Sequence, residues 1–145
     1  MSNRGTASTT CDPSGDAPPA DEALRAFCES YRAAWERRDL EAFLAMYDRP
    51  MLTVRLDGSL YCLREEAEFR AFFAAALDGY VATGYETAEL SVDRIAHAGR
   101  MAAVVDVTWI LRRARNEIVR QFRQTYNVRT TSGGWKIYAS TQHVE

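Results

Sequence analysis

Two neighbouring segments in the C-terminal half place polar side chains among strand-forming residues, and they offer the best candidates for chemistry. Asp106 interrupts the otherwise apolar run 101–113. A carboxylate there either enters a pocket, where burial raises its pKa as a general base requires, or pairs with an arginine on a neighbouring strand. It shares strand parity with Val104 and Ile110, opposite the apolar row Ala103–Trp109. If that row faces helices, Asp106 lies outside. We therefore favour a structural role and keep Asp106 as a weak catalytic candidate.

A row of polar side chains, Arg123, Thr125 and Asn127, alternates along the second segment. Facing a cavity, a guanidinium and an amide would suit the carboxylate or carbonyl of a small ligand. In the alternative, the row faces solvent while Phe122 and Tyr126 pack inside. Alternation does not choose between the two faces when each carries mixed residues.

Aromatic side chains at four separate positions could form the walls of such a cavity. Each of them could equally belong to an ordinary core, because aromatic residues dominate core packing. These candidate ligand-contacting residues are Tyr31, Trp35, Tyr47 and Trp109.

Other familiar chemistry is missing from the sequence. No set of His, Cys and carboxylate residues has the spacing of metal ligands, and no phosphate-binding, dinucleotide or nucleophile motif occurs. We therefore expect no metal and no cofactor. His97 in a turn and His143 near the C-terminus are interpreted as surface residues. A basic cluster is interpreted as a solvated hairpin tip; its members are Arg112, Arg113, Arg115 and Arg120.

Composition narrows the class of protein. The 145-residue chain has a net charge of −2, so no overall basic field attracts nucleic acid or an anionic membrane. No apolar run approaches the roughly 20 residues of a membrane helix. The N-terminus lacks the hydrophobic region of a secretory signal. Cys11, Cys28 and Cys62 have no short spacing, which predicts reduced thiols in a cytoplasmic protein.

Periodicity predicts the elements that must position these residues. Residues 1–20 hold almost nothing to bury and are predicted to be a flexible tail, followed by a single domain over 21–145. Apolar spacings of three and four indicate helices, the second ending at Pro50 and the third stopped by Gly79. Alternation indicates strands, with a bulge between Val92 and Ile95. The predicted helices cover 21–38, the stretch after Asp39 to Tyr47, and 64–77; the strands cover 51–56, 59–62, 88–96, 101–113, 117–130 and 135–144.

Several short motifs resemble the nuclear transport factor 2-like (NTF2-like) superfamily, and within it the small bacterial SnoaL-like proteins. They are Trp35-x-x-x-Asp39-Leu40-x-x-Phe43, Tyr47-Asp48-x-Pro50, Asp57-Gly58, Arg123-x-Thr125 and Gly134-Trp135-Lys136-Ile137. The resemblance spans about Asp21 to Val144. It implies an α+β fold of the ketosteroid isomerase and polyketide cyclase type: a cone-shaped barrel in which three N-terminal helices pack on the concave face of a curved antiparallel sheet.

The resemblance also implies a pocket between sheet and helices and a homodimer formed through the outer sheet face. Many relatives carry histidines two and four residues beyond the isoleucine of the last motif. Here Ala139 and Thr141 occupy those positions, which weakens the case for that chemistry. Thr141 joins Arg123, Thr125 and Asn127 as a candidate ligand contact.

Two functions follow as expectations. The first is binding of a small hydrophobic ligand with a carbonyl or carboxylate, with isomerase, dehydratase or cyclase activity as an open extension. The alternative is a non-catalytic dimeric binding or assembly module whose pocket is plugged by aromatic side chains, with Phe122 and Tyr126 facing the partner subunit. Neither function involves nucleic acid or a membrane. The fold alone does not decide between them.

Overall fold

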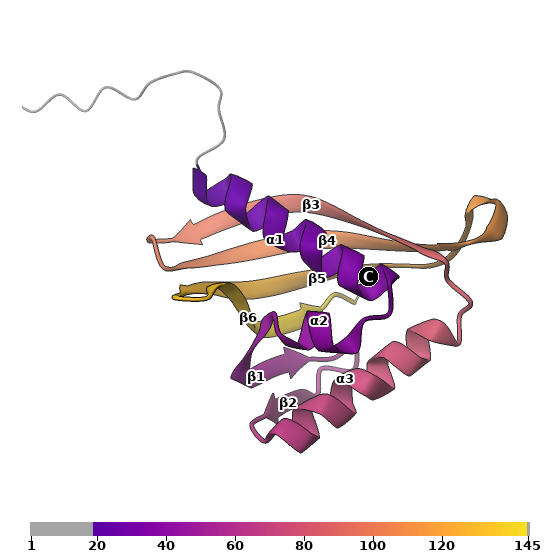
Figure 1. Cartoon of the computed structure of the whole chain (residues 1–145), viewed down its shortest axis with the longest axis horizontal. Coiled ribbons are helices and arrows are strands. Elements are labelled where there is room, and N and C mark those ends of the chain that lie inside the picture. The colour runs from indigo at the N-terminus through magenta and orange to yellow at the C-terminus, as the bar shows by residue number, and fades with distance from the viewer. Residues whose placement is uncertain (1–18, 145) are drawn as a thin grey trace, which may run out of the picture.

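The computed structural model describes residues 19–144 and shows three helices beside a six-stranded sheet (Figure 1). The helices are α1 (Pro19–Glu36), α2 (Leu40–Leu44) and α3 (Glu66–Val81). A short 3-10 turn, Ala114–Asn116, joins two of the strands. The strands are β1 (Tyr47–Val54), β2 (Leu60–Leu63), β3 (Thr87–Ala98), β4 (Ala102–Arg113), β5 (Glu117–Thr131) and β6 (Gly134–Gln142).

The sheet is curved and unclosed, with strand order β2-β1-β6-β5-β4-β3. All neighbouring strands pair antiparallel except β1 and β6, which run parallel. In Figure 1, α1 crosses the long strands β3 to β5, while α2 and α3 lie beside β1 and β2. The α+β class and NTF2-like architecture predicted from the sequence are confirmed.

Burial follows the predicted periodicities. On β4, the row from Ala103 to Leu111 is buried, and the intervening side chains are partly exposed. This row packs against the apolar stripe of α1, which includes Leu24, Tyr31 and Trp35. The Ala103–Trp109 row therefore faces the helices, which was the condition for an outward-facing Asp106. One sheet face must be covered to remove its apolar side chains from water.

The predicted boundaries fail at three places. The first helix begins at Pro19, two residues before the predicted cap, so only Pro19 and Ala20 of the predicted tail are described and residues 1–18 lie outside the described residues. The second helix ends at Leu44, and Pro50, behind a cis peptide bond, lies inside β1 at a break in its pairing with β6. Proline is tolerated there because no ladder hydrogen bond needs its missing N–H.

The third helix continues through Gly79 to Val81. Glycine costs helix stability but does not stop a helix whose neighbours pack against the core, and here Tyr80 and Val81 pack against it. None of the helices in the described range is long and apolar enough to span a bilayer.

Two irregularities in the sheet reorient side chains. The pairing of β3 with β4 shifts between Val92 and Arg94, which confirms the predicted bulge. The pairing of β4 with β5 shifts as well: Leu111 lies opposite Arg120, but Arg112 lies opposite Ile118. Arg120 stays in regular alternation with Phe122, on the same face as the buried Leu111, and the bulge changes the orientation of β5 only from Ile118 back toward the hairpin.

Candidate ligand-binding site

An inner cavity lies between the helices and the concave face of the sheet. The space open inside it is about 40 Å³, enough for a few water molecules. Its walls come from α1, α3 and four strands, and most of the lining side chains are aromatic. The aromatic members are Tyr31, Trp35, Tyr47, Phe72, Phe73, Tyr80, Tyr85, Trp109, Phe122 and Tyr126.

Tyr31 of α1 lies at the centre of this aromatic cluster. Its ring meets the rings of Trp109 and Tyr126 edge-on, with centroids 5.9 and 5.5 Å away. Its hydroxyl forms a short hydrogen bond with the hydroxyl of Tyr47. The Tyr126 hydroxyl accepts from Trp109 Nε1 at 2.9 Å and donates to Gln124 Oε1 at 2.6 Å. These contacts fix the buried polar atoms of the cavity and leave it rigid.

The buried phenols are neutral hydrogen-bonding groups. Burial raises the pKa of Tyr31 to about 12, although a hydrogen bond with Tyr47 acts in the opposite direction. Burial also holds the pKa of Tyr47 and of Tyr126 well above the ordinary range for a tyrosine. At neutral pH these groups can therefore polarise a carbonyl oxygen, but they cannot act as bases.

A stack of rings leads from the cavity to its mouth. Trp109 is stacked with Phe122 at a centroid distance of 6.3 Å, and Phe122 is stacked with Tyr80 of α3 at 5.6 Å. The guanidinium of Arg120 lies over both of the outer rings, 5.0 Å from the centroid of Tyr80 and 5.3 Å from that of Phe122. Arg120 lies two residues before Phe122 in the regular part of β5, so its side chain is on the same cavity face.

A second cation reaches the mouth from the turn between β1 and β2. Arg55 N–H donates to the carbonyl of Ser59, and Gly58, with φ of 81°, closes the turn by donating to the carbonyl of Arg55. Asp57 Oδ1 accepts from the backbone N–H and the hydroxyl of Ser59. The guanidinium of Arg55 lies 5.1 Å from the centroid of Phe72. The turn therefore holds Arg55 in place.

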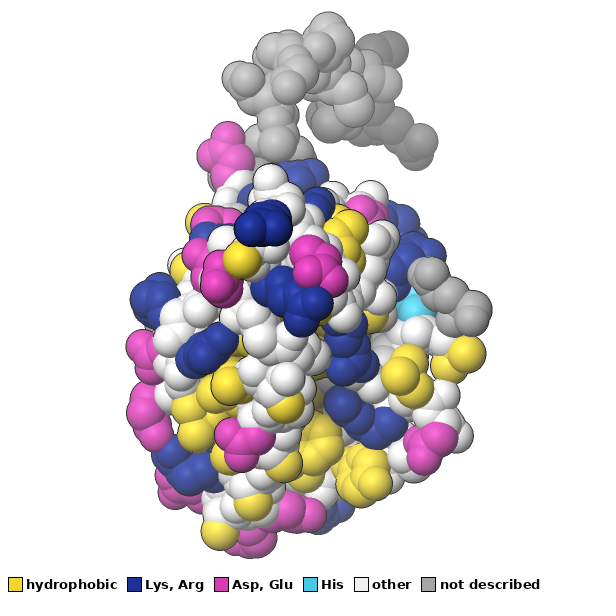
Figure 2. All heavy atoms as spheres, turned by 90° about the vertical axis from the view of Figure 1, so that its right-hand side faces the viewer, with side chains coloured by type: hydrophobic (Ala, Val, Ile, Leu, Met, Phe, Trp, Pro, Cys, Tyr) yellow, Lys and Arg dark blue, Asp and Glu magenta, His cyan; other side chains and the backbone are white. Residues whose placement is uncertain are grey.

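The inner cavity opens into a wider outer cleft of about 590 Å³. This cleft lies between the β1–β2 turn, α3, and the nearby ends of β5 and β6. Both spaces share lining residues, so they form one continuous site: Arg55, Phe72, Ala76, Tyr80 and Gln142. Figure 2 shows one face of the molecule, where basic and hydrophobic side chains lie next to each other in the lower half.

The inner cavity lining among the described residues contains no carboxylate and no histidine. Its polar side chains are phenols, the indole N–H groups, the hydroxyl of Ser140, the amides of Gln124 and Gln142, and one guanidinium. Asp57 lines only the outer cleft, and its carboxylate is turned to Ser59. No group of His, Cys, Asp and Glu in the described range could hold a metal ion.

The structure separates the sequence-predicted contacts into two sets. Tyr31, Trp35, Tyr47 and Trp109 line the cavity. The candidates Arg123, Thr125, Asn127 and Thr141 do not; β5 presents Phe122, Gln124 and Tyr126 to the cavity, and β6 presents Ser140 and Gln142. The expectation that the Arg123 row faces inward is therefore corrected. The same finding corrects the partner-facing placement of Phe122 and Tyr126. Phe122 and Tyr126 complete the aromatic core. Burying these two rings is more favourable than burying a row of polar side chains in the same place.

Asp106 lies on the outer face of the sheet and pairs with its neighbours. Arg94 Nε donates to Oδ2 at 2.8 Å, and the Thr125 hydroxyl donates to Oδ1 at 2.6 Å. His143 Nε2 lies 2.7 Å from the same hydroxyl. Partial burial raises the pKa of the Asp106 carboxyl, but the hydrogen bonds from Thr125 and Arg94 outweigh it, and the pKa is lower than that of an ordinary aspartate. Asp106 therefore pairs with an arginine on a neighbouring strand, which is the structural role that the sequence favoured.

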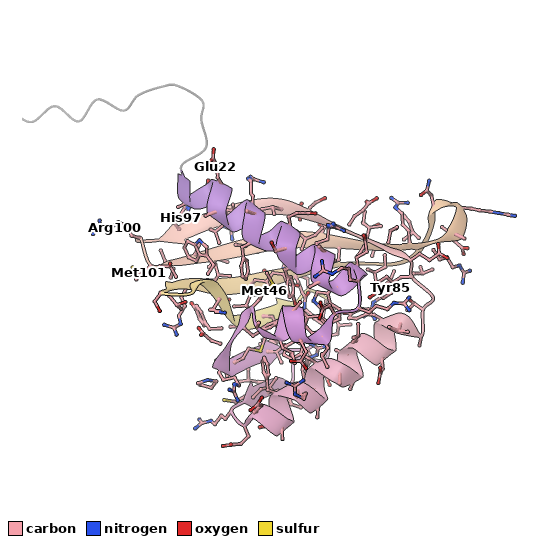
Figure 3. The ribbon with its side chains drawn as sticks, viewed as in Figure 1. Glu22, Met46, Tyr85, His97, Arg100 and Met101 are labelled. Carbon is pink, nitrogen blue, oxygen red and sulfur yellow. The ribbon has the colours of Figure 1, made fainter. Side chains whose placement is uncertain are left out.

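The other predicted surface residues anchor the ends of the fold. His97 ends β3, not a turn, and its Nε2 contacts the carboxylate of Asp21 at the start of α1. Figure 3 shows His97, Arg100 and Met101 at one end of the sheet, far from Tyr85 near the end of α3. The Tyr85 hydroxyl donates to the carbonyl of Trp35 at 2.6 Å. Tyr85 thus secures the end of α1 beside the cavity.

Sequence reasoning missed several residues of the site. Gln124 carried a usable signal, because it is a polar residue in the apolar row of Phe122 and Tyr126, as Asp106 is in its own strand. Tyr80 lay beyond the predicted end of its helix. Arg120 was grouped with the hairpin tip, but it lies in the inward row of β5 with Phe122 and contacts the rings of Tyr80 and Phe122. In the structure Arg112 and Arg113 pair with Glu89 and Glu117.

Residues 21–145 match a family described as NTF2-like protein (DUF6841). The chain belongs to this NTF2-like family. Solved structures agree in fold. A domain of unknown function with a cystatin-like fold from Nostoc punctiforme PCC 73102 is 23% identical, with a TM-score of 0.69 over 90% of this chain and 80% of that one. An NTF2-like protein of unknown function from Shewanella oneidensis MR-1 is 18% identical, with a TM-score of 0.67 over 84% and 97%.

A ketosteroid isomerase-like protein from Erwinia carotovora atroseptica SCRI1043 is also similar. It is 11% identical, with a TM-score of 0.64 over 89% of this chain and all 100% of that one. No curated protein shows significant similarity to the chain. At these identities the structural neighbours establish the NTF2-like fold alone.

Proposed function

We propose that this NTF2-like protein binds a small, mostly apolar molecule in the continuous site formed by the inner cavity and the outer cleft. The observation that carries the proposal is the shared lining of the two spaces by rings, one guanidinium and one buried amide. Apolar walls with a few fixed polar groups are typical of small-molecule sites. A carbonyl or carboxylate on the ligand would match the phenol, amide and guanidinium donors.

Catalysis of the isomerase, dehydratase or cyclase type is an extension of this proposal. Proton abstraction beside a carbonyl requires a base within hydrogen-bond reach. The inner cavity offers no carboxylate or imidazole among its described lining residues, and the pKa values of Tyr31, Tyr47 and Tyr126 are raised. The neutral donors could stabilise negative charge on a ligand oxygen. Binding is therefore the primary proposal.

A titration with the neutral fluorescent probe phenylnaphthylamine tests the binding proposal. Ala76 of α3 lines both spaces, so Ala76→Trp fills the passage between them. Ala71 of the same helix is exposed and lines neither, so Ala71→Trp is the matched control. We expect saturable binding to the wild type and to the Ala71→Trp variant, and at least tenfold weaker binding to Ala76→Trp.

Thermal unfolding of all three proteins is measured alongside probe binding, and it shows whether each variant is folded. Equal probe binding by the wild type and the folded Ala76→Trp variant would contradict the pocket proposal. So would the absence of saturable binding to the wild type.

A non-catalytic dimeric binding or assembly module is the second candidate. The observation that favours it is the small inner cavity, about 40 Å³, which aromatic side chains nearly fill. Without a bound ligand, the outer sheet face would then carry the specificity and form the homodimer. Cys28 and Cys62 are both free thiols, which supports the cytoplasmic location that we propose for either function.

A further inference from the structure

Two cations flank the mouth of the site, and they come from distant parts of the chain. Arg55 follows β1, and Arg120 lies on β5 after its bulge. Both line the outer cleft together with Tyr80 of α3. Burial raises the pKa of the Tyr80 hydroxyl, and the charges of Arg120 and Arg55 both act against this rise. Arg55, Arg120 and Tyr80 therefore line one cleft, and both positive charges act on the Tyr80 hydroxyl.

Neither guanidinium is neutralised by a carboxylate within the described part of the chain. Arg55 lies over Phe72, and its guanidinium makes one long hydrogen bond, 3.4 Å to Thr53 Oγ1, to a side chain among the described residues. Arg120 lies over Tyr80 and Phe122. Many other arginines form ion pairs with carboxylates: Arg32, Arg37, Arg49, Arg70, Arg94, Arg112, Arg113 and Arg129.

The ring contacts orient the two guanidinium groups without using their N–H donors. A cation over a ring face is attracted by the ring quadrupole, while its in-plane N–H groups stay open to an acceptor. Among the described residues that line the cleft, Asp57 is the one carboxylate. Its Oδ1 is hydrogen-bonded to Ser59, and these bonds lower its pKa more than the charge of Arg55 does. The buried amide of Gln142 adds a polar group where cavity and cleft meet.

We propose that the site selects a ligand with a carboxylate on a planar apolar body. The carboxylate binds at the mouth against Arg55 and Arg120, and the body lies along Phe72, Tyr80 and Phe122. A planar carboxylate matches the guanidinium fork, which can form two parallel hydrogen bonds with it. The rings supply the apolar contact area for the body. This inference rests on the proposed small-molecule site and specifies the ligand class that the site takes.

Paired titrations with naphthoate and naphthamide test the inference by isothermal calorimetry at fixed salt. The two compounds have the same ring system and nearly the same shape, but only naphthoate is charged. We expect the wild type to bind naphthoate about tenfold more tightly, which corresponds to roughly 1.4 kcal/mol. Arg55→Gln and Arg120→Gln should each remove most of this preference and leave naphthamide binding within about twofold.

Arg100→Gln is the control, because Arg100 is an exposed residue at the other end of the sheet (Figure 3). Arg55→Lys and Arg120→Lys keep the charge but lose the fork, so they should retain part of the preference. Thermal unfolding and phenylnaphthylamine binding show whether each variant still has an intact site.

The possible outcomes separate the two proposals. Equal affinity for naphthoate and naphthamide in the wild type would overturn anion selection and leave the small-molecule site in place. If folded glutamine variants bind neither naphthoate nor naphthamide, anion selection would also be overturned. The arginines would then maintain the shape of the cleft and not discriminate between a charged and a neutral ligand. If the wild type binds none of the three compounds, naphthoate, naphthamide or phenylnaphthylamine, the proposed function itself would be overturned.

Discussion

The two faces of the β4–β5 strand pair satisfy their polar groups in opposite ways. On the outer face, charges and hydroxyls pair with each other: Arg94 with Asp106, Asp106 with Thr125, and Thr108 with Asp93. On the inner face, the polar atoms are neutral and bonded to aromatic residues, as with Gln124 and Tyr126. The two cations at the edge of the inner face contact rings instead of carboxylates.

This difference indicates where binding capacity lies. The outer pairs are already satisfied, and they stabilise the strands without needing a ligand. The buried polar atoms of the inner face are hydrogen-bonded to each other, but the guanidinium groups at the mouth have no carboxylate acceptor in the described part of the protein. A surface whose donors are not matched by protein acceptors is the one that gains most from an added acceptor. The inner face is therefore the face at which we propose that a ligand binds.

Truncation of an inner ring gives the largest expected contrast between the faces. Trp109 is 3% exposed, and its indole N–H donates to Tyr126. Trp109→Ala should lower the free energy of unfolding by about 3–5 kcal/mol, because it leaves a cavity and removes the N–H that donates to the Tyr126 hydroxyl. Ile110→Ala on the outer face should cost less than about 1.5 kcal/mol. Urea unfolding measures both. Similar losses at the two positions would contradict the asymmetry.

The proposed dimer through the outer face gives the next contrast. Thr141 lies next to Thr125 on two central strands of the sheet and does not line the cavity. In a two-fold symmetric interface, the guanidinium added by Thr141→Arg appears twice and repels itself. We expect the dimer dissociation constant to rise at least tenfold in sedimentation velocity. Ala71→Arg on exposed α3 should leave it unchanged. A wild type that sediments as a monomer would disprove the outer-face dimer.

The Asp106 pair gives the smallest expected effect. Because the pKa of Asp106 is lowered in the folded state, its contribution is complete above the unfolded aspartate value of about 3.9 and disappears as pH falls through the folded value. Asp106→Asn should cost roughly 1 kcal/mol at neutral pH and weaken the acid dependence of stability.

Urea unfolding at neutral and acid pH measures the Asp106 effect, with the exposed Asp78→Asn as control. An unchanged acid profile would show that the hydrogen bonds of Asp106 do not favour its charged form. The affinities for naphthoate and naphthamide should be unchanged by Asp106→Asn and by Asp78→Asn.

The element order and the buried row of β4 could be predicted from the sequence because they depend on local periodicity. Two local patterns predict which side chains are buried: the alternation from Ala103 to Leu111, and the α1 stripe through Tyr31 and Trp35. The aromatic walls followed from the same reasoning. Boundaries were less predictable where packing overrides local preference, as at Gly79 within α3 and Pro50 within β1.

The sequence by itself determined the NTF2-like α+β fold, the aromatic interior and the outer placement of Asp106 once the Ala103–Trp109 row was assigned to the helices. Tertiary structure decided which face of β5 lines the cavity, since both faces alternate and only contact with α1 and α3 selects one. It also decided the site of Arg120, because Arg120 alternates in regular register with Phe122, so the choice of face for Phe122 places Arg120 on the cavity face as well. The placement of Arg55 and Arg120 along one cleft depends on strand pairing between segments far apart in the chain, which no local pattern encodes.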